Sequence, residues 1–274
     1  MKILVCIKQV PEFEHMEINE DLDGVAGRDL STDFKMNRFD EFAVETAIQI
    51  KENPPENQPD TEIHVLTVGP MRAADVLKRG IGMGAHHGIH LKTEAEDYLS
   101  PADIGALISD WISDWISGWI PGRSKTGDYD LILTGSMSED GMNGQVGPML
   151  AGHMNLPCAT QVIYSRMEAA GGPVYVEREI EGGHREMAEM SLPAVLAIQT
   201  GANRPRYPSL SNLMRASKQE LETIEAKTLA EPPAGEALEG FVMPRKTRAG
   251  RHLTGSAEEK AEQLIALLQD KAFI

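Results

Sequence analysis

One short segment combines residue types and a spacing that suit phosphate binding. Residues 135–147 read GSMSEDGMNGQVG; they follow the apolar run 130–134 and precede a helical pattern through Met149, Leu150 and His153. A strand, a loop of small residues and a helix N-terminus present several backbone N–H groups in one concavity, and such groups bind anions. In an open parallel sheet this loop lies at the carboxyl ends of the strands. The pattern predicts a phosphate-binding loop, and an ordinary connection between two elements is the open alternative.

Other catalytic patterns are missing from the sequence. It has no GxSxG elbow, no GxxxxGK[ST] loop, no HExxH pair and no DFG-type set. Its glycine-rich stretch, residues 80–88, follows a helical pattern instead of opening a helix. A dinucleotide fingerprint needs the strand–turn–helix context, so we reject that interpretation.

The histidines and cysteines offer little metal chemistry as a pattern. His86 and His87 would point to opposite faces of a strand, and no carboxylate or cysteine completes a site with them or with His90. We therefore expect no metal site. Cys6 and Cys158 form neither a CxxC pair nor a zinc spacing, which favours two buried thiols in a reducing compartment over a single disulfide.

Composition excludes several function classes. The chain has 274 residues and a formal net charge of −16, from 26 Lys plus Arg against 42 Asp plus Glu. That charge argues against nucleic acid and against an anionic membrane surface. Apolar residues make up 41% of the chain, which is too many for a disordered protein. The run 3–7 is too short for a signal peptide, and no stretch approaches the ~18 apolar residues of a membrane span, so we expect a soluble cytoplasmic protein without membrane insertion.

Alternating strand and helix patterns must position the loop. Apolar strands are expected at 3–7, 62–68, 88–91 and 130–134, with helices at 40–51, 71–83 and from Pro101 onward. This alternation predicts an α/β fold with a parallel sheet. Four further strand-like pieces, 161–165, 174–179, 186–192 and 194–199, follow one another with little between them. We expect them to be antiparallel additions to the same sheet.

The C-terminal part has a different character. Residues 225–255 are rich in proline and glycine and predict an extended arm, after which Ser256 opens an amphipathic helix. We therefore expect one domain at 1–224 and an arm with its helix at 225–274. A separate repeat, Trp111, Trp115 and Trp119, predicts a helix face packed on the sheet or on a subunit, with ligand stacking as the alternative.

Several blocks of the chain resemble one protein family. They read MKILVCIKQVP at 1–11, MNRFDEFAVETAIQIKE at 36–52, LTVGP…VLKRGIGMGAHHGIHL at 66–91, LILTGSMSEDGMNGQVGPMLAG at 131–152, VEREIEGG at 176–183 and LPAVLAIQTGANRPRYPSLSNLMRASK at 192–218. The last two blocks in this order make the match specific. The chain resembles the beta (small) subunits of electron-transfer flavoproteins over most of residues 1–218.

The resemblance implies a fold and a function. The fold would be of the adenine-nucleotide-binding α/β type, with helices on both faces of a mainly parallel sheet. The chain would pair with an alpha subunit that carries most FAD contacts, and its arm would wrap that subunit. It would bind AMP, or a second FAD in electron-bifurcating members. Electrons would pass from flavin dehydrogenases such as acyl-CoA dehydrogenase to a membrane quinone reductase, so the chain would be a carrier without its own substrate. A stand-alone nucleotide-binding regulatory protein is a third reading.

The resemblance also implies which residues contact the cofactors. Those carried over to the nucleotide are Cys6, Asn37, Arg38, Phe39, Asp40, Val68, Gly135, Ser138, Asp140, Gly141, Asn143, Gly144, Gln145 and Val146. Asn37 has helix capping as its alternative role. Phe13 falls where the family often has an aromatic near the FAD ring, and core packing is its alternative.

Two surfaces would meet other proteins. Glu179 matches a carboxylate that faces the flavin domain of the alpha subunit. Residues 208–218 match a loop that docks dehydrogenases, with Leu210 as the apolar anchor or, alternatively, an ordinary buried leucine. The docking residues carried over are Leu210, Ser211, Asn212, Leu213, Met214 and Arg215. Ser211 replaces a common proline and the usual lysine-rich run is interrupted, but Arg204, Arg206, Arg215 and Lys218 still predict a basic patch there.

Overall fold

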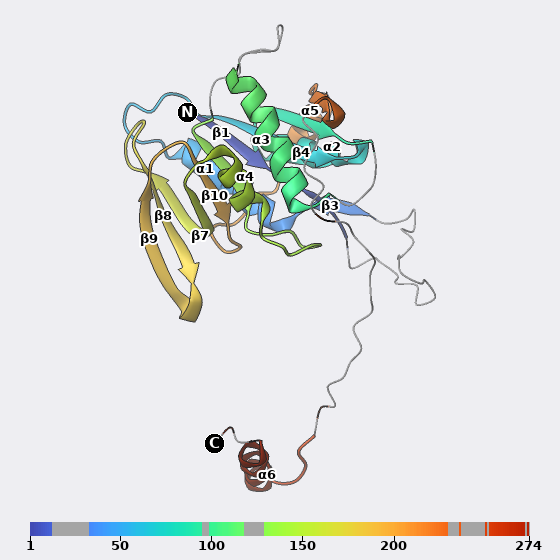
Figure 1. The fold of residues 1–274 in the computed structure, drawn as a ribbon, viewed down its shortest axis with the longest axis vertical. Coiled ribbons are helices and arrows are strands. Elements are labelled where there is room, and N and C mark those ends of the chain that lie inside the picture. The colour runs from blue at the N-terminus through green and yellow to red at the C-terminus, as the bar shows by residue number, and fades with distance from the viewer. Residues whose placement is uncertain are drawn as a thin grey trace. The chain divides into compact units, whose positions relative to one another are not determined.

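A nine-stranded sheet forms the centre of the structure (Figure 1). The computed structural model describes residues 1–12, 33–94, 99–117, 129–229, 236, 250, 252–271 and 273, without the side chains of 113–117. In spatial order the strands are β11 (Glu222–Glu225), β5 (His87–Lys92), β4 (Glu62–Gly69), β1 (Lys2–Cys6), β6 (Leu131–Gly135), β10 (Ala194–Ile198), β7 (Cys158–Met167), β8 (Val174–Ile180) and β9 (His184–Met190).

Most of this sheet is parallel, as predicted. All pairings from β11 across to β7 are parallel, and β8 and β9 add an antiparallel hairpin at the far edge. β1 lies between β4 and β6, with Ile3 in register with both Ile63 and Leu131. Its residues Ile3 to Cys6 are buried. They are apolar throughout because the strand is covered on both faces of the sheet.

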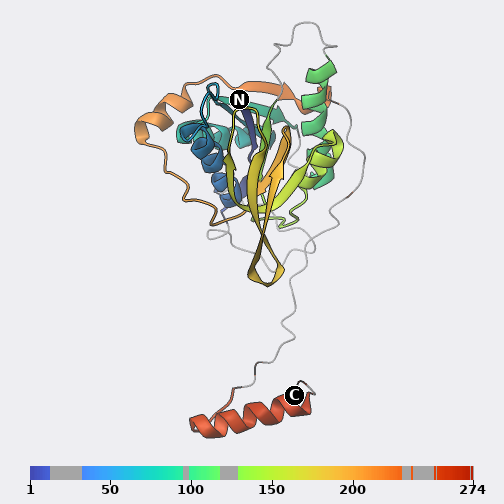
Figure 2. The ribbon, with the colours of Figure 1, turned by 90° about the vertical axis from the view of Figure 1, so that its left-hand side faces the viewer.

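Helices cover both faces of the sheet and form two cores. α1 (Arg38–Glu52) and α2 (Ala74–Met83) pack on the face that receives Ile3 and Val5 of β1. α3 (Pro101–Ser117) and α4 (Val146–Met154) pack on the opposite face, which receives Leu4. Figure 2 shows the sheet between these two helical layers. This arrangement confirms the predicted α/β fold with helices on both faces.

The prediction for residues 194–199 was wrong. β10 is a central parallel strand between β6 and β7, not an antiparallel addition. All five of its residues are buried, which is the pattern of β1. β7 is correspondingly mixed, since it runs parallel to β10 and antiparallel to β8. The apolar pattern of a strand shows that both of its faces are buried, but it does not show which strands pair with it.

Three short strands were not predicted. β11 extends the parallel sheet next to β5, and β2 (Gln9–Pro11) pairs with β3 (Phe34–Met36) in a separate antiparallel ribbon. Trp111 lies in the core beside α4, as the packing interpretation of the tryptophan repeat expects; Trp115 and Trp119 have no described side chains. Both cysteines are free thiols.

The C-terminal helix belongs to a unit separate from the one that holds the sheet and is described by itself. α6 (Ala257–Asp270) begins at the predicted Ser256, whose hydroxyl accepts the Glu259 N–H while the Glu259 carboxylate accepts the Ser256 N–H. Most of the predicted arm at 225–255 lies outside the described residues, and its domain boundary stays a prediction. Within the described ranges, no helix combines the length and apolar character needed to cross a membrane.

Candidate functional site

The predicted loop lies where neighbouring strands end. β1, β4, β6 and β10 run in the same direction. Their last residues, Cys6, Gly69, Gly135 and Ile198, therefore lie at the same end of the sheet, where the carboxyl ends of the strands meet. The loop starts directly after Gly135, and the Ser136 N–H donates to the Ile198 carbonyl at 2.8 Å. It leads into the N-terminus of α4 at Val146. The strand–loop–helix geometry expected from the sequence is confirmed.

Asp40 joins two strand ends to the first turn of α1. One carboxylate oxygen accepts the Lys8 N–H at 2.7 Å, and the other accepts the Gly135 N–H at 3.0 Å. The residue is buried, and burial raises the pKa of Asp40 to about 7. Its side chain therefore ties the ends of β1 and β6 to α1.

Asn37 holds the loop itself. Its Nδ2 donates to the Met137 carbonyl at 2.9 Å, and its Oδ1 accepts the Glu139 N–H at 3.1 Å. The residue stands at the N-cap position of α1, but its side chain makes no capping hydrogen bond. Arg38 adds a third link, since its N–H donates to the Glu139 carboxylate at 3.1 Å. Asn37 is buried at 1% exposure and acts on the loop instead of capping the helix.

Lys8, which follows β1, and hydrogen bonds within the loop itself also hold the loop in place. Lys8 Nζ lies 2.7 Å from Asp140 Oδ2, and the Gly141 N–H donates to Asp140 Oδ1 at 2.7 Å. The Met142 N–H donates to the Ser138 carbonyl at 2.9 Å. Lys8 was missed by sequence reasoning, although its place just after β1 put it at this edge.

The part of the loop after Asp140, together with the start of α4, offers backbone N–H donors that could bind a phosphate. Residues 141–143 and Gln145 are exposed, and Gly144 has φ of +63°. The first backbone N–H groups of α4 have no carbonyl partner within the helix, and the positive end of the helix dipole lies there. Close by, the Thr134 hydroxyl is buried without a hydrogen-bond partner among the described residues. A Cβ on Gly147 would lie 2.8 Å from that hydroxyl oxygen.

The other residues expected at the nucleotide have different surroundings. Cys6 is buried on the face covered by α3 and α4, and burial raises the pKa of its thiol to about 12. Val68 is half-buried near the end of β4. Phe39 packs closely against Gly135: a Cβ added to that glycine would lie 2.6 Å from Phe39 Cβ. Phe13 lies outside the described residues.

The predicted docking segment is a helix with an exposed apolar side. α5 (Leu210–Ser217) is capped by Ser209, whose hydroxyl accepts the Asn212 N–H at 3.2 Å. Leu210 is 75% exposed and Met214 is 56% exposed, which excludes the alternative of a buried leucine within the described chain. Leu213 packs over Gly82 of α2, where a Cβ would come within 3.0 Å of its Cδ2. The helix is thus fixed on one side and apolar on the other.

The predicted basic patch is smaller than expected. Arg206 is neutralised by two carboxylates of α1: its Nε lies 2.8 Å from Glu45 Oε2, and its Nη1 lies 2.6 Å from Glu52 Oε1. Arg204, Arg215 and Lys218 are exposed. Glu45 and Glu52 are seven residues apart and so share one helix face. This spacing of two carboxylates could have indicated a site for a basic side chain such as Arg206, but the sequence analysis did not consider it.

Glu179 lies near the end of β8. It is exposed and lines a surface cleft of about 480 Å³ together with Tyr164, Glu177 and Arg185. Its register partner on β9 is Arg185. The exposed carboxylate is therefore open to a partner.

Comparison with known proteins matches this architecture. The family model of the electron transfer flavoprotein domain matches residues 29–229. The chain is 32% identical to the electron transfer flavoprotein subunit beta of Bacillus subtilis over 252 residues, covering 89% of this chain and 90% of that protein. It is 34% identical to the subunit beta of Dictyostelium discoideum over 230 residues, covering 84% and 83%. The subunit beta of Bos taurus is 31% identical over 232 residues, covering 84% and 83%. The chain belongs to the electron transfer flavoprotein family, among its beta subunits.

Proposed function

We propose that the chain binds AMP at the loop between β6 and α4 and pairs with an alpha subunit that carries most contacts to FAD. The braced loop is the observation that carries this proposal. Asn37, Asp40 and Lys8 hold the backbone in place before any ligand arrives. Less conformational freedom is then lost when a phosphate binds. The names of the relatives, which are beta subunits, support the partnership with an alpha subunit.

The chain's own residues would bind and orient, not react. FAD supplies the chemistry, since its ring accepts and passes on electrons. Asn37 and Asp40 would keep the loop amides aimed at the phosphate, while the helix dipole of α4 favours its negative charge. Because the buried Cys6 thiol stays protonated at neutral pH, it would serve as packing near the base or ribose. The free thiols also support a reducing, cytoplasmic setting.

Counting the nucleotides tests the AMP assignment. The chain is co-expressed with its alpha partner, the purified complex is denatured, and the released nucleotides are separated and quantified. We expect one FAD and one AMP per heterodimer. Two FAD and no AMP would replace this reading with the electron-bifurcating one. A stable chain that needs neither partner nor nucleotide would instead favour the stand-alone regulatory protein.

We further propose that α5 docks flavin dehydrogenases such as acyl-CoA dehydrogenase, from which electrons pass on toward a quinone reductase. Leu210 and Met214 are four residues apart on α5 and form an exposed apolar strip, and Tyr207, just before this helix, is 87% exposed. Such strips on a charged surface mark sites of protein contact. The exposed Arg204, Arg215 and Lys218 would steer an acidic partner, and added salt would slow that encounter.

Leu210→Ala is expected to weaken docking without loss of flavin. Burying a leucine in a partner pocket stabilises a complex by roughly 1.5–3 kcal/mol. Its removal should therefore raise the KM for the complex in dehydrogenase assays by about 10- to 100-fold. Met71→Ala is the control, because Met71 is 62% exposed but lies outside α5. An unchanged KM for Leu210→Ala, or an equal rise for Met71→Ala, removes Leu210 from the anchor role.

A further inference from the structure

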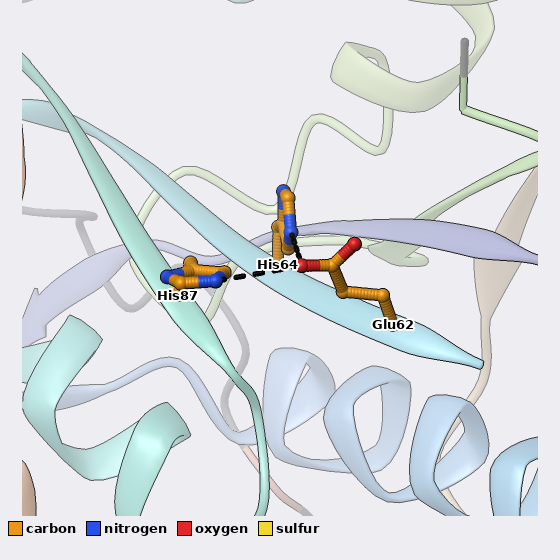
Figure 3. A group of neighbouring side chains, drawn as sticks. All are labelled: Glu62, His64 and His87. Atoms are coloured by element: carbon orange, nitrogen blue, oxygen red, sulfur yellow. Dashed lines mark ion pairs between the residues drawn. The ribbon is translucent and has the colours of Figure 1, made fainter. Parts of the chain in front are cut away.

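Three side chains of types that can bind transition metals converge where the strands begin, at the end of the sheet opposite the loop. Glu62 and His64 lie at the start of β4, and His87 begins β5 (Figure 3). Glu62 Oε1 lies 3.1 Å from His64 Nε2 and 3.4 Å from His87 Nε2. One possible ligand atom from each residue lies within 4.8 Å of the others.

The strand geometry brings them together. Glu62 and His64 are two residues apart in a strand, so their side chains share one face of the sheet. His64 and His87 are direct register partners on neighbouring parallel strands. Sequence reasoning compared His87 with its neighbour His86 and missed this triad, because no motif connects residues 62, 64 and 87.

The surroundings of His64 leave its Nε2 available to a cation. It is 4% exposed, and its Nδ1 lies 2.7 Å from the Tyr129 hydroxyl. Its buried Nε2 lies 3.1 Å from Glu62 Oε1, but it lacks hydrogen-bond geometry to that oxygen or to any other atom of the described residues. A bond from Nδ1 to an outer group is what fixes the orientation and tautomer of metal-binding histidines.

We propose that Glu62, His64 and His87 bind one divalent transition-metal ion of the zinc type. Zinc bonds of 2.0–2.1 Å in a tetrahedron place ligand atoms about 3.4 Å apart, close to the two separations seen here. Two imidazoles and one carboxylate favour zinc over magnesium or calcium, which prefer oxygen ligands. The His87 side chain is 60% exposed, so water has access to the fourth position.

The nearby charges permit this ion. Lys2 Nζ lies 3.8 Å from Glu62 Oε2 and leaves Oε1 to face the histidines. Glu222 lies on β11, beyond β5, and adds negative charge near Tyr129. A bound ion would tie the start of β4 to the start of β5, at the far end of the sheet from the nucleotide loop. The site does not depend on the proposed function.

Zinc titration of the complete complex tests the site. The protein is co-purified with its alpha partner, treated with a chelator, and titrated with Zn²⁺ alone against a chromophoric chelator. We expect one site per complex that His87→Ala weakens by at least about 100-fold, since even outer partners of a metal are worth 10- to 100-fold. Tyr129→Phe should weaken it by about tenfold or more. His184→Ala is the matched control, because His184 is also exposed and also begins a strand.

The outcomes separate clearly. Loss of one zinc in His87→Ala and in Glu62→Gln, with retention in His184→Ala, supports the site. No zinc in the unmodified complex, or equal binding by the His87→Ala and His184→Ala proteins, overturns it. Flavin and AMP content, measured on the same samples, should stay constant in all variants. A failed nucleotide count would overturn the proposed function without affecting the zinc result.

Discussion

Gly135→Ala is expected to destabilise the protein by about 3–5 kcal/mol, through overpacking and a lost backbone hydrogen bond. A Cβ at residue 135 would lie 2.6 Å from Phe39 Cβ and 2.9 Å from the Phe39 carbonyl carbon, and it would collide with Asp40 Oδ1. These atoms belong to the first turn of α1, which cannot move without the helix. Retreat of α1 would also break the bond from the Gly135 N–H to Asp40.

Denaturant unfolding of the complex measures this loss, and nucleotide content of the same samples reports on the loop. Gly152→Ala is the matched control, because Gly152 also lies in this region but a Cβ there meets nothing within 4 Å. In α4 that change should leave stability unchanged or raise it by up to about 1 kcal/mol. Equal effects of the two substitutions would refute the close contact between α1 and the end of β6.

Arg206→Ala is expected to cost about 3 kcal/mol and to loosen the segment that leads into α5. The Glu45 side chain is only 4% exposed and accepts hydrogen bonds from the backbone N–H, Nε and Nη2 of Arg206. Without the guanidinium, the nearly buried Glu45 carboxylate keeps the N–H of residue 206 and the Gln49 amide as donors but loses its cationic partner. That loss is more damaging than loss of a surface ion pair. The same arginine reaches Glu52 through two further bonds.

Arg204→Ala provides the control, since Arg204 is exposed and lies two residues earlier. It should change the free energy of unfolding by less than about 0.5 kcal/mol. Adding Glu45→Gln to the Arg206→Ala protein should restore part of the loss, because the unpaired charge is then gone. If Arg206→Ala unfolds at the same denaturant concentration as Arg204→Ala, the ion pairs do not hold this segment.

The sequence alone predicted the local elements and their class. β1 and β6 are short apolar runs, α2 ends at Met83 as the predicted range 71–83 does, and α6 follows a capping Ser256. Each of these features depends on neighbours within a few residues, so the pattern is complete in the sequence. The resemblance to beta subunits came from such blocks and is confirmed by the family match.

Pairings between distant segments were decided only by the tertiary structure. β10 carries the same apolar pattern as β1, so nothing local showed that it lies between β6 and β7. Asn37 and Asp40 form hydrogen bonds to residues about a hundred positions away and so hold the loop, which no local pattern showed. Residues 62, 64 and 87 form no motif, yet strand register places them side by side. Hydrophobic periodicity determines which faces are buried; only the packed sheet decides which polar groups meet.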